Sequence, residues 1–442
     1  MKNIWMIIAL ITVGGSACNK FLEVKPKGVV IPEKLSDFEG LLNSRTMIFT
    51  FPSTLLYCTD DYYGEYNEQE RNLQANAYYW RRDIDQNEQT SPAIWGDGYK
   101  IVYYANIIIN NVLKATESNE QQRRQILAEG LAARAEIYFT MLTAFAKAYN
   151  PATASADPGL PLVTATNVTE KIPQRSSVQA TLDSLVHDLQ LAIPMLPEQS
   201  INRYRCTKYA ASGMLSRIYL YMGNYAEADR FADSALQARH ELLDYNDYKN
   251  ALDLPEADIN PEVLWQRSAD DYKVPGEMLY SDTLKTLFHE GDLRYSLLTF
   301  EMPDGITRYG TSGFANFGIT FPELYLTRAE VAARKGNIPA AMDFVNLLRK
   351  ARFETDRYVP LTAVTQEEAL DIVLAERRRE MAFSGQRWMD MKRLDREGRM
   401  PAIKRVDRET GAVITILEPN SSHYTFQIPA SVRRFNPDMA IN

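Results

Sequence analysis

Between Tyr209 and Ala238 the chain reads YAASGMLSRIYLYMGNYAEADRFADSALQA, and this stretch indicates how the protein folds. It contains a helical run with small residues in its middle, then Gly223-Asn224, then a second run with the apolar spacing of an amphipathic helix. Small residues allow two helices to approach closely, and glycine suits the left-handed position that ends a helix. The stretch therefore predicts two closely packed helices joined by a Gly-Asn turn.

The same arrangement recurs further along the chain. Phe321–Ala351 reads FPELYLTRAEVAARKGNIPAAMDFVNLLRKA, again with a Gly-Asn pair, Gly336-Asn337, between two helical runs. Units of two helices in about 34 residues are typical of tetratricopeptide repeats. Helical periodicity also marks Gly98–Ala115, Gln121–Tyr149 and Val178–Ile193, the last of which is ended by prolines. The predicted fold class is therefore mainly α, built from tetratricopeptide-like helix pairs with little β structure.

Two long segments lack this periodicity. Phe49–Trp95 and Leu242–Thr320 are irregular and rich in aromatic residues, and the second also in Asp, Pro and Gly. Long irregular segments in a compact protein are usually functional or disordered, and the aromatic content favours ordered loops that form a ligand-binding face. Asn150–Val163, rich in Pro and Ala, is also predicted to be a loop. We divide the chain into a signal peptide (1–17), an N-terminal region (18–240) and a C-terminal region (241–442) with a loop-rich insertion (241–320), the two regions forming one continuous fold.

Composition excludes several functions. The chain has 442 residues, of which 45% are hydrophobic and 24% charged, and a formal net charge of −8. The basic face that nucleic acid requires is therefore not expected. The four histidines are scattered singly and the three cysteines form no CxxC pair, so no metal site and no cofactor are expected. Cys58 and Cys206 either form a disulfide or remain two buried free thiols, and their spacing does not distinguish these alternatives.

The N-terminus has the pattern of an exported protein. Lys2 precedes an apolar run of about ten residues, Ile4–Val13, which is too short to span a bilayer core of about 30 Å. Small residues then lead to Cys18, as in bacterial lipoprotein signals, whose cysteine becomes the acylated first residue of the mature chain. Several acyl chains at Cys18 would anchor the protein stably. Gly15 stands where such signals usually have leucine, so a plain secretory signal is the alternative.

The densest charged motif is AERRREMAFSGQRWMDMKRL (Ala375–Leu394). On a helix, Glu376 and Glu380 continue an apolar stripe and could be interpreted as an acid–base pair. Neighbouring arginines keep carboxylates ionised, however, and this is the opposite of what a general acid needs. We therefore predict a structural ion-pair network that contains Glu376, Arg377, Arg378, Arg379, Glu380, Arg387, Trp388 and Asp390.

A second carboxylate pair, Asp60 and Asp61, could be interpreted as a glycosidase dyad. Adjacent residues of an extended chain point to opposite sides, so the two would rarely flank one glycosidic bond. A turn rich in Asp and Gly is the better interpretation. The sequence also has no GxSxG, Walker or dinucleotide-binding motif, and no catalytic residue is predicted.

Aromatic residues remain as the functional candidates. The chain has 25 Tyr, 17 Phe and 5 Trp, and a Tyr or Trp ring can stack on the apolar face of a sugar without any catalytic group. The candidate ligand-binding rings are Tyr78, Tyr79, Trp80, Trp265, Tyr272, Tyr280 and Tyr309. Packing is the better explanation of any one of these rings, but together they mark the loops as the place to look for a ligand.

Four stretches together resemble the SusD/RagB family, surface lipoproteins of glycan-degrading Gram-negative bacteria. They are ACNKFLEVKPKG (Ala17–Gly28), DDYYG with IWGDGYKIVYYANIIINNV (Ile94–Val112), ERRREMAFSGQRWMDMKRL, and the ending FQIPASVRRFNPDMAIN (Phe426–Asn442). The last two are the specific ones, and the four together span nearly the whole chain.

The resemblance implies a SusD-like superhelix of four tetratricopeptide-like helix pairs that supports a loop-rich ligand face. It implies a protein without enzymatic activity that is anchored by lipid in the outer membrane and exposed at the cell surface. Such a protein captures oligosaccharides, or peptides in the RagB branch, and delivers them to a SusC-like TonB-dependent transporter. The family's binding aromatics lie in variable loops, so no ligand-binding residue is transferred to this chain.

Two other functions are compatible with the sequence. A tetratricopeptide scaffold of the envelope would copurify with a transporter but bind neither glycans nor peptides in titration calorimetry. A surface hydrolase would release reducing ends from a glycan panel. These measurements separate both alternatives from a binding lipoprotein.

Overall fold

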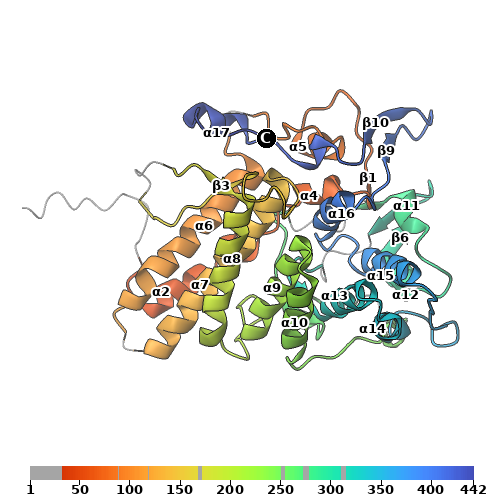
Figure 1. The fold of residues 1–442 in the computed structure, drawn as a ribbon, viewed down its shortest axis with the longest axis horizontal. Coiled ribbons are helices and arrows are strands. Elements are labelled where there is room, and N and C mark those ends of the chain that lie inside the picture. Colours follow the sequence, from red (N-terminus) through yellow and green to blue (C-terminus); the bar gives the residue numbers. More distant parts are fainter. Residues whose placement is uncertain are drawn as a thin grey trace, which may run out of the picture.

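The structure, a computed structural model, describes residues 32–87, 89–117, 119–167, 172–249, 254–271, 278–309 and 315–442. Long helices stand side by side in a row that follows the chain from orange to blue (Figure 1). The row consists of α6 (Ala93–Asn111), α7 (Glu120–Phe145), α8 (Val178–Ala192), α9 (Lys208–Met222), α10 (Tyr225–Leu236), α13 (Phe321–Arg334), α14 (Ile338–Lys350) and α15 (Gln366–Glu380). The predicted mainly α fold class is confirmed.

Both Gly-Asn turns have the geometry that a tight helix–helix connection requires. Gly223 follows α9 with a φ of +73°, and Gly336 follows α13 with a φ of +75°. The side chains of Asn224 and Asn337 each accept a hydrogen bond from a backbone N–H in the first turn of the next helix. Each glycine thus takes the left-handed conformation, while each asparagine satisfies an N–H that would otherwise lack a partner.

Replacing Gly336 by alanine should lower the free energy of unfolding by about 1–2 kcal/mol, because left-handed backbone strains a residue with a Cβ. Space is not the reason, since the nearest atom to the new Cβ, in Gln366, is 3.8 Å away. Gly40 is a matched control: it lies exposed in α2 (Leu35–Leu42) with nothing within 4 Å, so Gly40→Ala should stabilise by up to about 1 kcal/mol. Urea unfolding should show shifts of opposite sign, and a Gly336→Ala protein as stable as the wild type would contradict the turn geometry.

Small residues allow the close packing of the helix row. In α9 the Ser216 hydroxyl donates to the carbonyl of Ala228 in α10 at 2.8 Å, and a Cβ on Gly213 would lie 2.6 Å from Ile319. A cluster between α13, α14 and α15 is built largely from alanine and valine: Ala329, Ala333, Ala341, Val345, Ala369 and Val373. The larger apolar cluster contains residues from Leu35 to Met439, so distant parts of the chain share one core.

The two irregular segments meet along the upper and right edges of the row in Figure 1. There four strands form an antiparallel sheet in the order β1 (Tyr62–Tyr63), β5 (Leu279–Tyr280), β7 (Thr307–Tyr309) and β6 (Thr299–Glu301). In this sheet Tyr62 pairs with Tyr280, and Leu279 pairs with Arg308. The sheet therefore joins segments more than 200 residues apart. The helices and strands not yet given are α3 (Arg45–Ile48), α4 (Thr54–Tyr57), α5 (Leu73–Tyr78), β2 (Pro158–Pro161), β3 (Arg175–Ser177), β4 (Val263–Trp265), α11 (Asp282–Lys285), α12 (Leu293–Leu298), β8 (Ile319–Thr320), α16 (Arg387–Arg396), β9 (Ile403–Val406), β10 (Val413–Leu417) and α17 (Ala430–Phe435).

Two details differ from, or complete, the sequence-based expectations. The stretch Asn150–Val163 is not a loop throughout, because β2 lies within it and pairs antiparallel with β3. Cys58 and Cys206 are both buried free thiols, so of the two alternatives the disulfide is wrong. Burial raises the pKa of both thiols, which keeps them protonated.

Candidate ligand-binding site

A cleft lined by tyrosines lies where the four-stranded sheet meets the hairpin of β9 and β10. It consists of two adjoining cavities of about 410 and 480 Å³, which have Tyr63, Tyr78 and Arg408 in common. We call both together the tyrosine cleft, the first cavity its basic compartment and the second its acidic compartment. The basic compartment also contains Tyr62, Tyr280, Lys285, Arg378, Lys404 and Arg405, and the acidic compartment Glu65, Tyr66, Tyr79, Asp304, Asp407 and Glu409.

The tyrosine rings of the cleft brace one another. The ring centres of Tyr62 and Tyr78 are 5.7 Å apart with planes at 82°, and those of Tyr78 and Tyr79 are 5.1 Å apart at 67°. Such edge-to-face contacts are a favoured arrangement of aromatic pairs. The hydroxyls of Tyr62 and Tyr66 are 3.3 Å apart and share a hydrogen bond. Tyr63 is only half-buried and borders both compartments, so its ring is the best placed to meet a ligand.

A buried arginine holds the floor of the cleft in place. The Arg405 guanidinium, on β9, donates to four backbone carbonyls at 2.8–3.2 Å, those of Tyr57, Thr59, Tyr62 and Tyr78. It also lies 4.0 Å from the ring centre of Tyr78. Burial lowers the pKa of Arg405, although its many partners keep the group in place. One side chain therefore connects the C-terminal hairpin to the residues before and after β1.

Asp60 and Asp61 lie in a turn, as predicted, but they are buried and paired with arginines. Arg387 donates to both carboxylate oxygens of Asp60 at 2.6 and 2.8 Å, and Arg378 donates to Asp61 at 2.7 Å. Burial would raise the pKa of Asp60, but the two guanidinium groups outweigh burial and hold that pKa well below its ordinary value. Burial raises the pKa of Asp61, which also lies beside the charge of Asp60. Both carboxylates are engaged by arginines, which argues against a catalytic dyad here.

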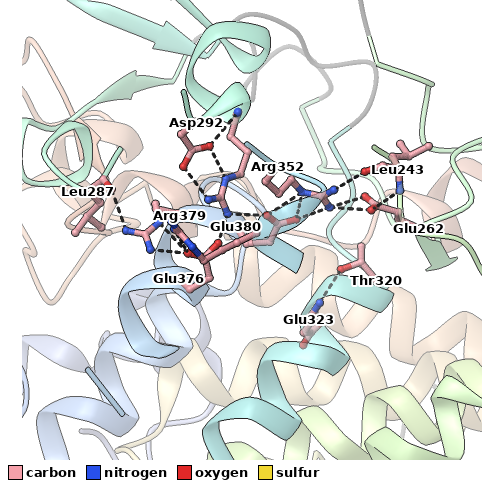
Figure 2. Close-up of polar contacts among 12 residues, drawn as sticks. Leu243, Glu262, Leu287, Asp292, Thr320, Glu323, Arg352, Glu376, Arg379 and Glu380 are labelled. Atoms are coloured by element: carbon pink, nitrogen blue, oxygen red, sulfur yellow. Dashed lines mark hydrogen bonds and ion pairs between the residues drawn. The ribbon is translucent and has the colours of Figure 1, made fainter. Parts of the chain in front are cut away.

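The charged motif of α15 lies in a buried ion-pair network (Figure 2). The Glu376 carboxylate accepts hydrogen bonds from Arg294 at 2.6 Å, from Arg349 at 3.2 Å and from Arg379 at 2.5 Å. Burial would raise the pKa of Glu376, but these three guanidinium groups lower it to about 2. Glu376 is therefore a permanent anion that compensates three buried cations.

Glu380 extends this network to the loops. It accepts from Arg352 at 2.8 Å, and the same arginine donates to Glu262 at 2.8 Å and to the carbonyl of Leu243 at 2.9 Å (Figure 2). The loop-rich insertion is thus tied to α15 by buried charges. Because Arg378 lies on the same helix and lines the basic compartment, α15 supports both the network and the cleft.

The remaining residues of the motif connect α15 to α16 and to the helix row. Arg377 donates to Asp390 at 2.8 Å. The Trp388 indole N–H donates to the carbonyl of Thr143, at the end of α7, at 3.2 Å. The predicted charged residues are all in ion pairs, but in three separate clusters rather than one network: Glu376, Arg379 and Glu380 with Arg294 and Arg352, Arg377 and Asp390 with Arg393, and Arg378 and Arg387 with Asp60 and Asp61. Trp388 contributes a hydrogen bond and ring packing rather than a charge.

The structure separates the predicted ligand-binding aromatics into two groups. Tyr78 and Tyr280 border the basic compartment, Tyr79 borders the acidic compartment, and Tyr309 borders a smaller neighbouring cavity of about 90 Å³. All four are buried, with 2–6% of each residue exposed, so at most an edge of each ring can meet a ligand. For these four rings, ligand contact stays a prediction.

Trp80 and Trp265 are packed in the core instead. They are 1% and 0% exposed, and their indole N–H groups donate to the carbonyls of Cys58 and Tyr204. A ring with no exposed face cannot stack on a sugar, so in this conformation packing explains both. Tyr272 lies outside the described residues, as do Cys18 and the segment 1–17.

Sequence reasoning missed the contribution of the C-terminal hairpin. Lys404, Arg405 and Arg408 line the cleft more than 300 residues after Tyr63. The IKRV stretch at Ile403–Val406 lacks the apolar–polar alternation of a half-buried strand, because the structure buries Arg405 and exposes Val406, so the sequence carried no signal for this wall of the cleft. Tyr62 and Tyr63 directly follow Asp60 and Asp61 in the DDYYG stretch, but they are not among the rings predicted to bind a ligand.

The described residues contain no group of three or more His, Cys, Asp and Glu side chains placed to hold a metal ion. Among the helices of the described ranges, none has the length and apolar character needed to cross a bilayer.

The chain is similar to known proteins over most of its length. Residues 20–220 match a family model described as "Starch-binding associating with outer membrane", and residues 294–440 match one described as "SusD family". SusD-like protein P2 of Formosa agariphila is 24% identical over 89% of this chain and 90% of that protein. SusD-like protein P25 of the same organism is 24% identical over 56% of this chain, and that match spans only 48% of the relative's own length. The crystal structure of a SusD superfamily protein from Bacteroides thetaiotaomicron covers 92% of this chain and 99% of that chain, with a TM-score of 0.77 at 20% identity.

A row of paired helices that carries a loop-built cleft defines a helical-repeat protein with a cleft at its edge. The two family models between them match most of the sequence, and the superposed fold agrees with them. The chain belongs to the SusD/RagB family, as its motifs indicated.

Proposed function

We propose that the protein is a non-catalytic lipoprotein of the outer membrane that binds oligosaccharides in the tyrosine cleft at the cell surface. It would deliver them to a SusC-like TonB-dependent transporter. The observation that carries the proposal is the cleft itself, whose rings are braced by one another and whose floor is held by Arg405. Aromatic walls with a few polar groups suit the alternating apolar faces and hydroxyls of a sugar chain. The description of the N-terminal family model, starch-binding and associated with the outer membrane, supports the same function.

The geometry of the charged groups favours binding over catalysis. Asp60, which lines the basic compartment, is held as an anion by Arg387 and Arg378. A general acid must carry a proton near neutral pH, and this environment removes it. Release of reducing ends from bound glycans would contradict a purely binding role.

Replacing Tyr63 by alanine should weaken oligosaccharide binding about tenfold or more, because it removes the half-buried ring between the two compartments. Titration calorimetry over a panel of glycan oligosaccharides would first identify a ligand and then compare the variants. Tyr104→Ala, which removes a half-buried ring on α6, outside the cleft lining, is the control and should bind like the wild type. If no glycan bound but members of a peptide library did, a peptide-binding role would replace this proposal. If neither bound but the protein copurified with a transporter, a scaffold role would replace it.

Replacing Cys18 by alanine should move the protein from the membrane fraction to the soluble fraction, because the proposed acyl chains would have no thiol to attach to. Asn19→Ala keeps the thiol and should remain with the membrane. The measurement is fractionation of cells that express each variant, followed by detection of the protein. Retention of Cys18→Ala in the membrane fraction would show that something other than lipid anchors the chain.

A further inference from the structure

The basic compartment has a charge opposite to that of the whole protein. The chain carries a formal net charge of −8, yet among the residues that the structure describes five basic side chains and two acidic ones line this cavity. The basic residues are Lys285, Arg378, Lys404, Arg405 and Arg408, and the acidic ones are Asp60 and Asp282. Such a local excess of cations in an anionic protein needs a physical explanation.

Of the five cations, only Arg378 forms an ion pair with a residue that the structure describes. Arg378 donates to Asp61 at 2.7 Å and lies 3.2 Å from Asp60. Asp60 is also bound by Arg387, which lies outside the lining, and its charge also reaches the buried Arg405, but it forms no ion pair with Lys285, Lys404 or Arg408. Asp282, exposed at the start of α11, forms no ion pair with any residue of the described ranges.

The other four cations have no carboxylate within 4.0 Å among the residues that the structure describes. Lys285 donates to the carbonyl of Gly305 at 3.3 Å, and the Arg408 guanidinium lies 5.5 Å from the ring centre of Tyr63. Lys404 and Arg408 are exposed on the hairpin. Arg405 is buried, and its hydrogen bonds go to neutral carbonyls. The cavity therefore has a buried cation in its floor and three accessible cations at its rim.

The acidic compartment has the opposite charge. Its lining contains Glu65, Asp304, Asp407 and Glu409, and within the described ranges Arg408, at the boundary, is its one basic residue. A ligand that lies across Tyr63 therefore passes from an anionic environment to a cationic one. An anionic group is attracted to one end and repelled from the other, so this polarity both selects and orients a charged chain.

We propose that the tyrosine cleft selects oligosaccharides that carry anionic groups, carboxylates of uronic acids or sulfate esters, and places an anionic group in the basic compartment. Lys404, Arg408 and Lys285 are its charge-assisted donors, and the neutral sugar ring stacks on Tyr63. The acidic compartment accepts hydrogen bonds from sugar hydroxyls. This inference rests on the proposed glycan-binding function and adds the class of glycan.

Matched ligands test the charge without changing the sugar. Oligogalacturonides are compared with the same oligosaccharides after methyl esterification, and sulfated dextran oligosaccharides with unsulfated ones, by titration calorimetry at low and high salt. The charged member of at least one pair should bind about tenfold more tightly or better, and the difference should shrink as salt rises because the rim charges are exposed. The pair that shows the preference identifies the anion as carboxylate or sulfate.

Variants of the cleft residues test whether the preference for the charged ligand arises in the basic compartment. The double change Lys404→Gln with Arg408→Gln should abolish most of the preference, while Lys100→Gln, an exposed lysine on α6, should leave it unchanged. Because all three side chains are exposed, thermal unfolding should match the wild type. A preference that survives the double change, or equal or tighter binding of the neutral member in every pair, overturns this inference and leaves glycan binding intact. No binding of any charged or neutral glycan overturns the proposed function as well.

Discussion

Replacing Glu376 by glutamine should lower the free energy of unfolding by about 3–5 kcal/mol. The carboxylate is completely buried and accepts hydrogen bonds from Arg294, Arg349 and Arg379. Glutamine has nearly the same shape but no charge, so three buried guanidinium groups would lose their shared anion. Breaking a buried ion pair from one side is costly, because the remaining charge stays out of water without compensation.

Glu367→Gln is the matched control for this variant. Glu367 lies on the same helix and pairs with Arg399 at 2.7 Å, but it is exposed to solvent. Exposed ion pairs contribute little to stability, so this variant should unfold at the same urea concentration as the wild type. If Glu376→Gln unfolded like this control, the network would not stabilise the attachment of the loops to α15.

Replacing Arg405 by methionine should lower the free energy of unfolding by about 3 kcal/mol or more. Methionine fills much of the space but leaves buried carbonyls around β1 without their donor, and each unsatisfied acceptor costs about 1–3 kcal/mol. The guanidinium contact with the Tyr78 ring is lost as well. Because these carbonyls border the cleft, the same change should also reduce oligosaccharide affinity.

Urea unfolding and amide hydrogen exchange would check this result. Exchange should increase around β1, where the carbonyls lose their donor, and not in α13 and α14, whose carbonyls do not bind Arg405. Arg408→Met is the stability control, since Arg408 lies on the same hairpin but is exposed, and it should change the free energy of unfolding by less than about 0.5 kcal/mol. Equal stability of the two variants would mean that water, rather than Arg405, can satisfy the carbonyls.

The Glu376 network and Arg405 have a common role: each attaches an irregular part of the chain to the rest of the fold. The α15 network attaches the loop-rich insertion to the helix row through Glu376 and Glu380, and Arg405 attaches the hairpin to β1. Both use arginine, whose planar fork of donors can bind several acceptors at once. Loops with few regular elements lack the backbone ladders that stabilise sheets, so side-chain anchors of this kind keep the cleft in one shape.

Local sequence patterns predicted the helix row well, because they express local physics. The Gly-Asn turns at Gly223 and Gly336 require only the left-handed freedom of glycine, which is a property of the residue itself. Apolar spacing likewise predicted α7, α9 and α13 from their own residues. The strand β2 inside Asn150–Val163 was missed because its pairing with β3 depends on a partner elsewhere in the chain.

The cleft was only partly predictable for the same reason. Tyr78, Tyr79 and Tyr280 stand among the candidate rings and do line it, whereas Trp80 and Trp265 turn into the core. The residues on either side of a tyrosine or tryptophan do not indicate whether its ring will be covered by another part of the folded chain. The basic side chains of the hairpin line a cleft whose other walls come from much earlier in the chain, and Arg405 binds carbonyls there, more than 300 residues away in sequence.

The sequence by itself determined the helical framework, the family and the charged motif of α15, since periodicity, turn residues and motif spacing are local properties of the chain. The tertiary structure alone determined which aromatic faces stay open, how Asp60 and Asp61 are neutralised, and that a basic cavity adjoins an acidic one. Those features arise when segments near residues 60, 280 and 405 meet, and the burial and charge of each side chain depend on that meeting.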